Sequence, residues 1–586
     1  MNLIVRCTTI PKRNPIAIIQ FILLLLLIQA IHYVEAVNTL YNESQLQINT
    51  TSGRFIGLST HLETPHPVSC WLGIPYAEKP IGPLRYKAPI PLINQTQSSE
   101  SDQPLQTAWE FGNACPQGPS PDIPVPISED CLSLNIYKPT EPPPSPKQKT
   151  FQSSHPLLPI LVWIHGGGLT YGSSSQYDGS AIVSHSHGMK KPIIVITINY
   201  RLNSFGFLAS DTLPVEDLSA GLQDQIAALK WIGVNAASFG GDVKNHRTSL
   251  ELLSWTLVEQ QGCNDLKSQF MDSLDCLRSL PEKLLTNLTG KLTQYGRFQK
   301  QIIWNPTWKI GSWINQRPSK NLKSNQFLKI PVIMGCNQDE GTYGGIGAVP
   351  SWSDEVIHDF NRYIDTSDPV TQKPMILDPN QNQDLSSNES DQLLSTFISN
   401  SSVFDLRTSN PNVLNRLIQL YPDQAELGAP YFTGNQTFGL PSSFKRLAAW
   451  FGDAHYEAPR RLMSSITSSR QPTYVYRFTG PRNTSESSFL GVHHSAEFAL
   501  IFDSGWYQDL TDEDKVATYA LSKKMRTYYI NFVNELDPGK DWPLYKPESK
   551  LVMKLDKYNS SIIKDVWRIE AMDYMNSEEV FDMYSV

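Results

Sequence analysis

The chain has 586 residues, of which 40% are hydrophobic and 18% are charged, an ordinary composition for a globular protein with a large core. Its formal net charge of −8 and its lack of basic runs argue against nucleic acid as a partner. The sequence also carries no cluster of residues spaced as metal ligands and no phosphate-cradling loop.

Residues 1–36 are expected to form a secretory signal peptide. Basic residues precede an apolar run at residues 16–31, and the small residues around Ala36 fit cleavage before Val37. An uncleaved membrane anchor is the alternative, but the run is short for a membrane span. Residues 37–586 would then be extracellular. Acceptor sequons for N-glycosylation fit that location, at Asn42, Asn49, Asn94, Asn287, Asn388, Asn400, Asn435, Asn483 and Asn559.

An extracellular location permits disulfide bonds. After the signal peptide the cysteines are Cys70, Cys115, Cys131, Cys263, Cys276 and Cys336. Pairing Cys115 with Cys131, or Cys263 with Cys276, would close a short loop. The sequence alone leaves every pairing of the six open.

The most informative stretch is an apolar run that ends in three glycines. Residues 159–164 are continuously apolar, which predicts a strand buried on both faces, and His165-Gly166-Gly167-Gly168 follows at once. Consecutive glycines are costly to order, so they make sense where the backbone must come close to a ligand. In acyl-transfer enzymes such a turn offers N–H groups to an oxyanion. An ordinary glycine-rich turn is the alternative.

Other segments alternate between strand and helix patterns. Further strands are predicted at residues 131–137, 193–200, 330–335 and 474–478. Helical spacing of apolar residues runs from Leu222 to Ile232, and residues 515–535 predict a C-terminal helix. This alternation favours an α/β architecture with a mostly parallel sheet.

Several motifs, in this order, resemble the type-B carboxylesterase/lipase family of the α/β-hydrolase fold. Besides the glycine turn they are residues 129–135, 220–225, 239–242, 339–341 and 491–494. The likeness runs from about Gly73 to Phe581, nearly the whole mature chain. It implies one large α/β-hydrolase domain over residues 37–586 that acts on small-molecule or lipid carboxylic esters without a metal or other cofactor.

The resemblance also implies roles for individual residues. Gly167 and Gly168 would supply the oxyanion N–H groups, Glu340 would be the triad acid, and His494 would be the general base. The neighbouring Asp339 and His493 are the alternatives for the acid and the base. The same resemblance implies two disulfides, Cys115–Cys131 and Cys263–Cys276, and leaves Cys70 and Cys336 as buried free thiols.

The catalytic serine is missing. The family places Gly-x-Ser-x-Gly on a strained turn between a strand and a helix, and no such pattern occurs in this chain. It should follow Asp242, where the sequence instead passes through Ser249, in a stretch that reads as helical, to Gly262. We therefore expect a sheet that is incomplete at the nucleophile strand. The sequence is interpreted as an incomplete esterase, produced by a skipped exon or a mispredicted gene, with little or no turnover.

Two functions are compatible with these observations. The first is a secreted carboxylic ester hydrolase represented by a defective sequence, and the second is a non-catalytic binding or adhesion protein on the same fold. Retention of the glycine turn, Glu340 and His494 favours the first. The loop between Cys115 and Cys131 lacks the aromatic residue that would hold a quaternary ammonium, which argues against choline esters.

Overall fold

The computed structural model describes most of the chain. The described residues are 46–60, 64–93, 104–120, 122–140, 156–210, 212–249, 273–298, 304–346, 385–400, 411–480, 489–503 and 510–581. The expected signal peptide, at residues 1–36, and Cys263 lie outside these ranges. No described helix combines the length and the apolar character needed to cross a membrane.

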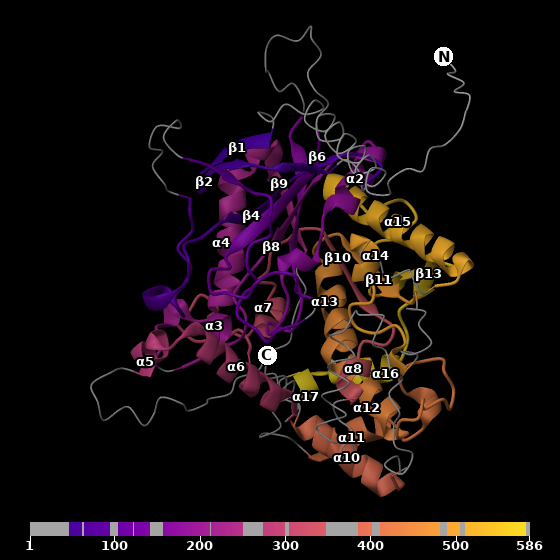
Figure 1. Cartoon of the computed structure of the whole chain (residues 1–586). Coiled ribbons are helices and arrows are strands. Elements are labelled where there is room, and N and C mark those ends of the chain that lie inside the picture. The colour runs from indigo at the N-terminus through magenta and orange to yellow at the C-terminus, as the bar shows by residue number, and fades with distance from the viewer. Residues whose placement is uncertain are drawn as a thin grey trace, which may run out of the picture.

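The largest sheet has six strands and occupies the centre of the indigo and magenta half of the molecule (Figure 1). Neighbours within it follow the order β3 (Leu58–Thr60), β4 (Val68–Pro75), β6 (Ser133–Pro139), β8 (Ile194–Ile198), β7 (Leu158–Ile164) and β9 (Gly241–Ser249). The pairs from β3 to β8 are antiparallel, and β8, β7 and β9 run parallel.

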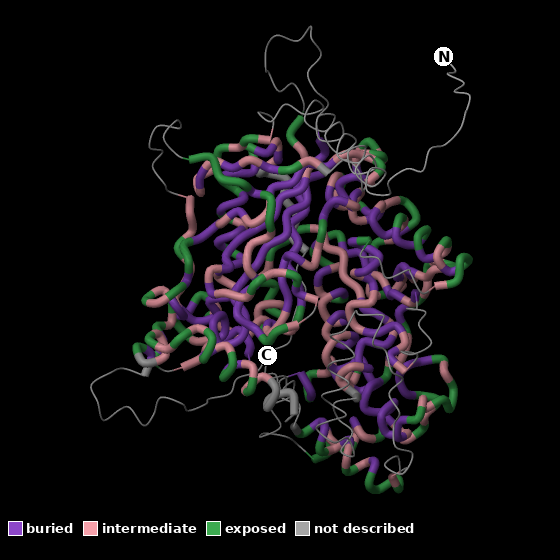
Figure 2. Tube along the Cα trace, viewed as in Figure 1, coloured by how far each residue is buried: buried purple, intermediate pink, exposed green. Residues whose placement is uncertain are grey.

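Strand β7 has one helix layer on each face, as its unbroken apolar sequence predicts. Ile160, Val162 and Ile164 belong to the core formed with α4 (Ala220–Asn235). The intervening Leu161 and Trp163 belong to the core formed with α2 (Ser180–Gly188) and α15 (Asp512–Glu535). Buried residues accordingly follow the strands of this sheet (Figure 2).

A second sheet has four strands and shares the α15 layer with the first. Its order is β10 (Val332–Asn337), β11 (Thr473–Phe478), β12 (Leu551–Leu555) and β13 (Ser561–Lys564), with the first three parallel. Helix α15 begins at an N-cap, where the Thr511 side chain accepts the Asp514 N–H and three acidic residues occupy the first turn. A small third sheet contains β1 (Gln47–Thr50), β2 (Gly53–Ile56) and β5 (Leu105–Thr107).

The remaining helices surround the two larger sheets, and several pack on one another beside the second sheet in a core of their own (Figure 1). They are α3 (Asn203–Phe207), α5 (Ser273–Ser279), α6 (Glu282–Phe298), α7 (Pro318–Lys323), α8 (Thr342–Ile346), α10 (Ser387–Asn400), α11 (Pro411–Leu420), α12 (Ser443–Gly452), α13 (Ala458–Ser468), α14 (Phe498–Phe502), α16 (Ile569–Met575) and α17 (Glu578–Phe581).

Strand β9 corrects the expectation that the nucleophile strand is missing. Residues Gly241–Ser249 form a strand parallel to β7, with Val162 opposite Thr248 and Trp163 opposite Ser249. Ser249 therefore ends a strand and does not lie in a helix. The sequence of β9 is polar, so apolar patterning gave no sign of it, whereas its pairing uses backbone groups that every residue carries. Among the described strands, β9 pairs only with β7, and the two larger sheets are not hydrogen-bonded to each other.

A buried ion pair joins the loop after β8 to helix α4. The Arg201 guanidinium donates to both oxygens of Asp224, at 2.8 Å from Nε and 2.7 Å from Nη2, and the Arg201 backbone N–H donates to the same carboxylate at 3.0 Å. The side chains are 2% and 0% exposed. Each charge is therefore stabilised mainly by its partner and not by water.

We expect Asp224→Asn to lower the free energy of unfolding by about 3–5 kcal/mol, because it leaves the Arg201 charge buried without a counter-ion. Urea denaturation followed by circular dichroism measures this change. Asp130→Asn is the matched control, because Asp130 pairs with Lys79 at the surface, with 44% and 66% of the two side chains exposed. The control should cost about 1 kcal/mol or less. Equal losses in the two variants would contradict the role assigned to the buried pair.

Candidate active site

The predicted acid, Glu340, lies on the loop that follows β10, here called the acid loop. The predicted base, His494, comes after β11 in the sequence, on what is here called the histidine loop. Asp339, on the loop that follows β10, ties them together. Its N–H donates to the Val492 carbonyl at 2.9 Å, and its Oδ2 accepts the Val492 N–H at 2.8 Å. Its Oδ1 accepts the Tyr431 N–H at 2.7 Å. Asp339 is 1% exposed, so its buried hydrogen bonds hold the acid loop against the histidine loop.

The histidine loop has a glycine where Asp339 needs one. Gly491 has a φ of 59°, in the left-handed region, and a Cβ there would lie 2.4 Å from Asp339 Oδ2. Any larger residue would push the carboxylate out of the position in which it holds Val492. The close approach of the two loops thus depends on this glycine.

Glu340 and His494 meet directly. His494 Nδ1 lies 2.7 Å from Glu340 Oε2, and Glu340 Oε1 accepts the Asn337 N–H at 2.6 Å. The Glu340 side chain is 7% exposed, whereas that of His494 is 28% exposed. The tilted ring of Tyr456 lies beside the imidazole, with 4.8 Å between ring centroids. A buried carboxylate therefore orients a histidine that solvent can reach.

Asp339 and His493, the alternatives for acid and base, have other contacts. The Asp339 carboxylate accepts the backbone N–H groups described above. The His493 imidazole is buried, with Nδ1 2.7 Å from the His494 carbonyl oxygen and its ring against the edge of Tyr343 at 4.9 Å. The geometry that an acid–base pair requires is present between Glu340 and His494.

A third carboxyl group, Glu497, lies behind this pair. Its Oε2 accepts a hydrogen bond from the Asn337 side chain, and the residue is 7% exposed. Burial, together with the negative charge of nearby Glu340, raises the pKa of Glu497 to about 7. Burial also raises the pKa of Asp339 to about 6, against the lowering effect of the two backbone N–H groups that it accepts. The site therefore contains two carboxyl groups that titrate near neutral pH.

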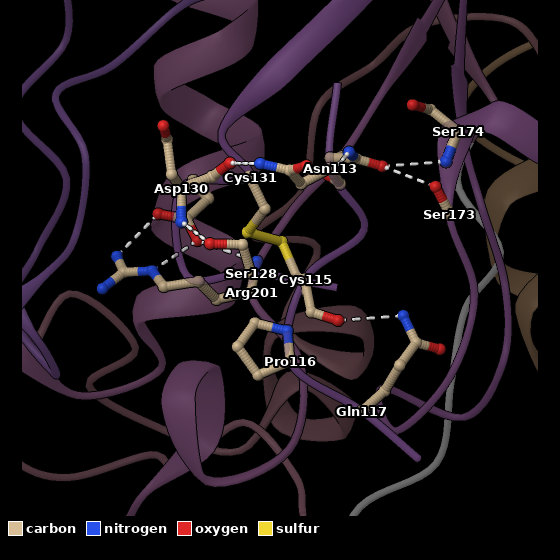
Figure 3. The surroundings of a disulfide bond; sticks show 12 residues. Asn113, Cys115, Pro116, Gln117, Ser128, Asp130, Cys131, Ser173, Ser174 and Arg201 are labelled. Carbon is tan, nitrogen blue, oxygen red and sulfur yellow. Dashed lines mark hydrogen bonds and ion pairs between the residues drawn. A yellow bond between two sulfur atoms is a disulfide. The ribbon is translucent and has the colours of Figure 1, made fainter. Parts of the chain in front are cut away.

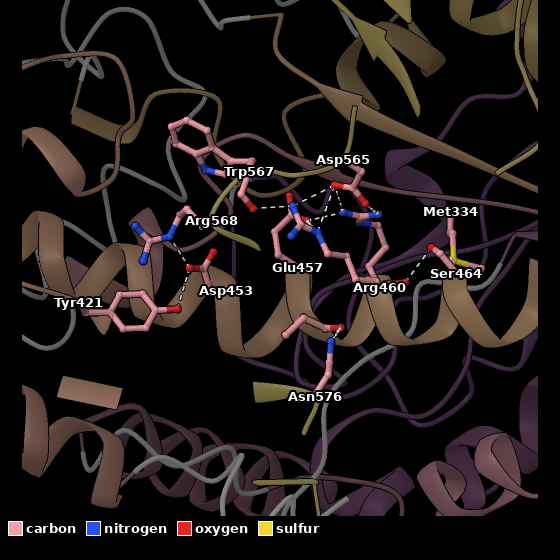
Figure 4. Close-up of polar contacts among 12 residues, drawn as sticks. Met334, Tyr421, Asp453, Glu457, Arg460, Ser464, Asp565, Trp567, Arg568 and Asn576 are labelled. Atoms are coloured by element: carbon pink, nitrogen blue, oxygen red, sulfur yellow. Dashed lines mark hydrogen bonds and ion pairs between the residues drawn. The ribbon is translucent and has the colours of Figure 1, made fainter. Parts of the chain in front are cut away.

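A network of buried ion pairs lies along helix α13 (Figure 4). Asp565 accepts from Arg460 at 2.8 Å and from Arg461 Nε at 3.1 Å, and Arg460 also pairs with Glu457 at 2.6 Å. Residues of this network line a small hollow beneath the acid loop, together with the loop itself: Asn337, Asp339, Glu340, Glu457, Arg477 and Trp567. The acid loop thus lies next to a buried network of ion pairs.

The glycine turn after β7 is held by its own backbone. Gly167 has a φ of 110°, and its carbonyl accepts the N–H groups of Thr170 and Tyr171 at 3.1 and 3.0 Å. A Cβ at Gly167 would lie 1.9 Å from the Tyr171 carbonyl oxygen, so no other residue fits this turn. Gly168 also has a positive φ, of 61°. Within the described part of the chain, the N–H groups of Gly167 and Gly168 donate no hydrogen bond.

Aromatic contacts connect β7 to the helix that follows the histidine loop. Trp163, near the end of β7, lies edge-on to Phe498 and Phe502 of α14, at 5.1 and 4.7 Å between centroids. His494 is four residues before Phe498, and the glycine turn starts two residues after Ile164. The strand that precedes the turn and the helix that follows the base are therefore packed together.

The Cys115–Cys131 disulfide is present, which confirms one of the two predicted pairs (Figure 3). The side chain of Gln117, just after Cys115, donates to the Cys115 and Gly172 carbonyls at 3.0 and 2.9 Å, which joins this loop to the end of the glycine turn. Cys70 and Cys336 are buried free thiols, as predicted. Cys263 and the side chain of Cys276 lie outside the described residues.

Sequence reasoning missed Asn337 and Tyr456 as site residues and gave Glu497 no role. Asn337 stands two residues before the motif at residues 339–341, and its side chain has no chemistry of its own that would single it out. Tyr456 lies in the π-helical segment Asp453–Glu457, and no spacing rule links that segment to His494. Among the described residues, no group of histidines, cysteines and carboxylates is arranged to hold a metal ion.

Comparison with known proteins identifies a family match and relatives of this chain. The model of the carboxylesterase family matches residues 44–245 and 251–574. Lipase 1 of Geotrichum candidum is 26% identical over 595 residues, covering 87% of this chain and 92% of the relative. Secreted lipase 1 of Botryotinia fuckeliana is 26% identical over 584 residues, covering 87% and 89%. Carboxylesterase 3B of Mus musculus is 32% identical over 331 residues, covering 50% and 55%.

The chain therefore belongs to the carboxylesterase family and has the α/β-hydrolase fold. The family match is interrupted at residues 246–250, in the last part of β9 and the residue after it.

The raised pKa of Glu497 makes stability depend on pH. Below about pH 4 the carboxyl group is protonated in both folded and unfolded chains. As the pH rises toward 7, the unfolded chain loses this proton while the folded chain keeps it, so stability falls. With the folded pKa at about 7, the loss attributable to Glu497 is about 3 kcal/mol.

Glu497→Gln should remove that contribution. We expect the difference in unfolding free energy between the variant and the native protein to shift in favour of the variant by about 3 kcal/mol between pH 4 and pH 8. Urea denaturation at a series of pH values measures it. Asp512→Asn, at a fully exposed position of α15, is the control and should show no such trend. A pH-independent difference for Glu497→Gln would disprove the titration.

Proposed function

We propose that this protein represents a secreted carboxylic ester hydrolase of the Ser-Glu-His type whose serine is absent from the present sequence. The observation that carries the proposal is the 2.7 Å contact between His494 Nδ1 and Glu340 Oε2, in a member of the carboxylesterase family. A histidine oriented by a buried carboxylate, and still open to solvent, is the arrangement that a general base needs.

Each retained group has a defined task in ester hydrolysis. His494 takes the proton of the attacking hydroxyl at Nε2 and later gives it to the leaving alcohol. Glu340 holds the imidazole through Nδ1 and stabilises its protonated form. The N–H groups of Gly167 and Gly168 donate to the oxyanion of the tetrahedral intermediate, and the strained turn fixes their direction before the reaction begins. No cofactor enters any of these steps.

The attacking group is the missing component. Strand β9 ends at Ser249, and the family places its nucleophile on a sharp turn directly after such a strand. No Gly-x-Ser-x-Gly occurs there or elsewhere in the sequence, and the interruption of the family match falls at residues 246–250. Both observations support a segment lost or altered at the end of β9, from a skipped exon or a mispredicted gene. The chain as it stands should then turn over esters poorly or not at all.

A binding or adhesion protein on the same fold is the second candidate function, and the lack of a serine is the observation that favours it. Retention of the glycine turn together with Glu340 and His494 weighs against it, because a binding protein does not need an acid–base pair. The alternatives differ in what the transcript should contain.

The proposal extends to location and substrate. A signal peptide at residues 1–36 and one catalytic domain over residues 37–586 fit the relatives, two of which are named secreted lipases. The relatives' names include both lipases and carboxylesterases, so the substrate is a lipid or small-molecule carboxylic ester. The lack of an aromatic residue between Cys115 and Cys131 argues against choline esters.

We expect the purified protein to hydrolyse a short nitrophenyl ester about a millionfold more slowly than an esterase with an intact nucleophile, the scale of loss seen when a catalytic serine is removed. A spectrophotometric assay measures the rate, and the His494→Ala variant of the same chain is the control. Clear turnover that His494→Ala abolishes would show that this chain has a nucleophile after all.

Sequencing the transcript across the codons for Asp242 to Cys263 tests the proposed loss. We expect an additional in-frame segment that encodes Gly-x-Ser-x-Gly, placed after the codons of β9. A transcript that matches the present chain would favour the binding or adhesion function.

A further inference from the structure

Asn337 is hydrogen-bonded to the acid, to the residue that precedes the base and to the third carboxyl group of the site. Asn337 is the last residue of β10, where it pairs with Phe478 of β11, and it is 0% exposed. Its amide nitrogen Nδ2 donates to the His493 carbonyl at 2.8 Å and to Glu497 Oε2. Its backbone N–H donates to Glu340 Oε1 at 2.6 Å. One residue therefore touches all three segments on which the acid–base pair depends.

The two acceptors at Nδ2 fix the orientation of the amide. The His493 carbonyl can only accept a hydrogen bond, so the amide must present Nδ2 to it. Turning the amide over would place its carbonyl oxygen against the His493 carbonyl and lose that bond. Glu497, which accepts from the same nitrogen, holds Asn337 in this rotamer, and Asn337 in turn holds the residue that directly precedes His494.

The geometry points to Asn337 as the positioning residue of the Glu340–His494 pair, with Glu497 as the group that orients it; this inference rests on the proposed function. The backbone N–H at position 337 holds Glu340 Oε1, so that Oε2 faces the imidazole, and this bond is kept in the variants tested below. The Asn337 side chain fixes the imidazole from the other side, through the carbonyl of His493. Neither contact reaches the reacting atoms, so the residue acts through the acid and the base.

Other groups around Glu497 complete its surroundings. Glu340 and His494 act on it electrostatically from the two loops, and Tyr476 of β11 and Tyr529 of α15 face it from the elements packed behind. Tyr476 and Tyr529 are hydrogen-bonded to each other and are partly buried. Among these groups, Asn337 donates a hydrogen bond to Glu497 and also bonds the acid, through its backbone N–H, and the carbonyl of the residue before the base.

The test observes the His494–Glu340 hydrogen bond directly, so it does not depend on the missing serine. In protein with isotope-labelled histidine, a proton shared between His494 Nδ1 and Glu340 gives a resonance far downfield of the amide protons, and Glu340→Gln identifies it by its disappearance. We expect Asn337→Leu to abolish this resonance or move it toward the amide region, while circular dichroism shows that the fold is kept.

Asn135→Leu is the matched control. Asn135 is also a buried strand asparagine that makes three hydrogen bonds, to Gly73, Ser174 and Thr197, but it lies on β6, away from the acid–base pair. It should leave the resonance unchanged even where it lowers stability. If Asn337→Leu does not fold, Asn337→Asp keeps the volume of the side chain but cannot donate to the His493 carbonyl, and it should shift the resonance.

Three outcomes decide the matter. A resonance that is present in the native protein and lost or shifted only in the Asn337 variants supports the positioning role. A resonance that both folded variants keep unchanged overturns that role and leaves the proposed function standing. A native protein without the resonance lacks the acid–base contact in solution, which overturns both.

Discussion

The contact between the acid and the base depends on the buried carboxylate of Asp339. Glu340 and His494 lie 154 positions apart in the sequence, and each is on a loop that could take many conformations. Asp339 removes this freedom by accepting backbone N–H groups from Val492 and Tyr431. The parallel pairing of β10 and β11 brings the starting points of these contacts together. The catalytic geometry is thus a consequence of backbone hydrogen bonds.

The layered core holds this arrangement in place. Alternate residues of β7 face α4 and the α15 layer, so the strand leading to the glycine turn is fixed from both sides. Trp163 extends the second layer to α14, directly after the histidine loop. The acid loop rests on buried, mutually neutralised charges around Arg460 and Asp565. Burying these charges is favourable only while every partner is present, which ties the site to the integrity of the fold.

The sequence predicted those elements whose buried side chains leave a regular apolar pattern. The apolar runs of β7 and β8 and the periodic stripe of α4 were predictable because burial on a regular element leaves a pattern. The family resemblance supplied Glu340 and His494, and the geometry selects them over Asp339 and His493. Strand β9 was not predictable, because its polar residues follow no period. Asn337 was not predictable either, because its role depends on hydrogen bonds with residues that only the fold brings together.

The presence of β9 changes the consequence of the missing serine. A chain without its central strand would expose two sheet edges and lose a layer of its core. With Gly241–Ser249 paired to β7, a strand occupies that position of the sheet. A folded molecule that keeps the Glu340–His494 contact without a catalytic serine is therefore physically reasonable.

Treatment of the purified protein with a fluorophosphonate probe, followed by mass spectrometry, tests this conclusion most directly. Such probes form a covalent bond with a serine that an oriented histidine has activated. A chain that keeps Glu340 and His494 but has no nucleophile should remain unlabelled, while an intact esterase treated in parallel becomes fully labelled. A stoichiometric adduct on any serine of this chain, lost in His494→Ala, would contradict the conclusion and identify the missing nucleophile.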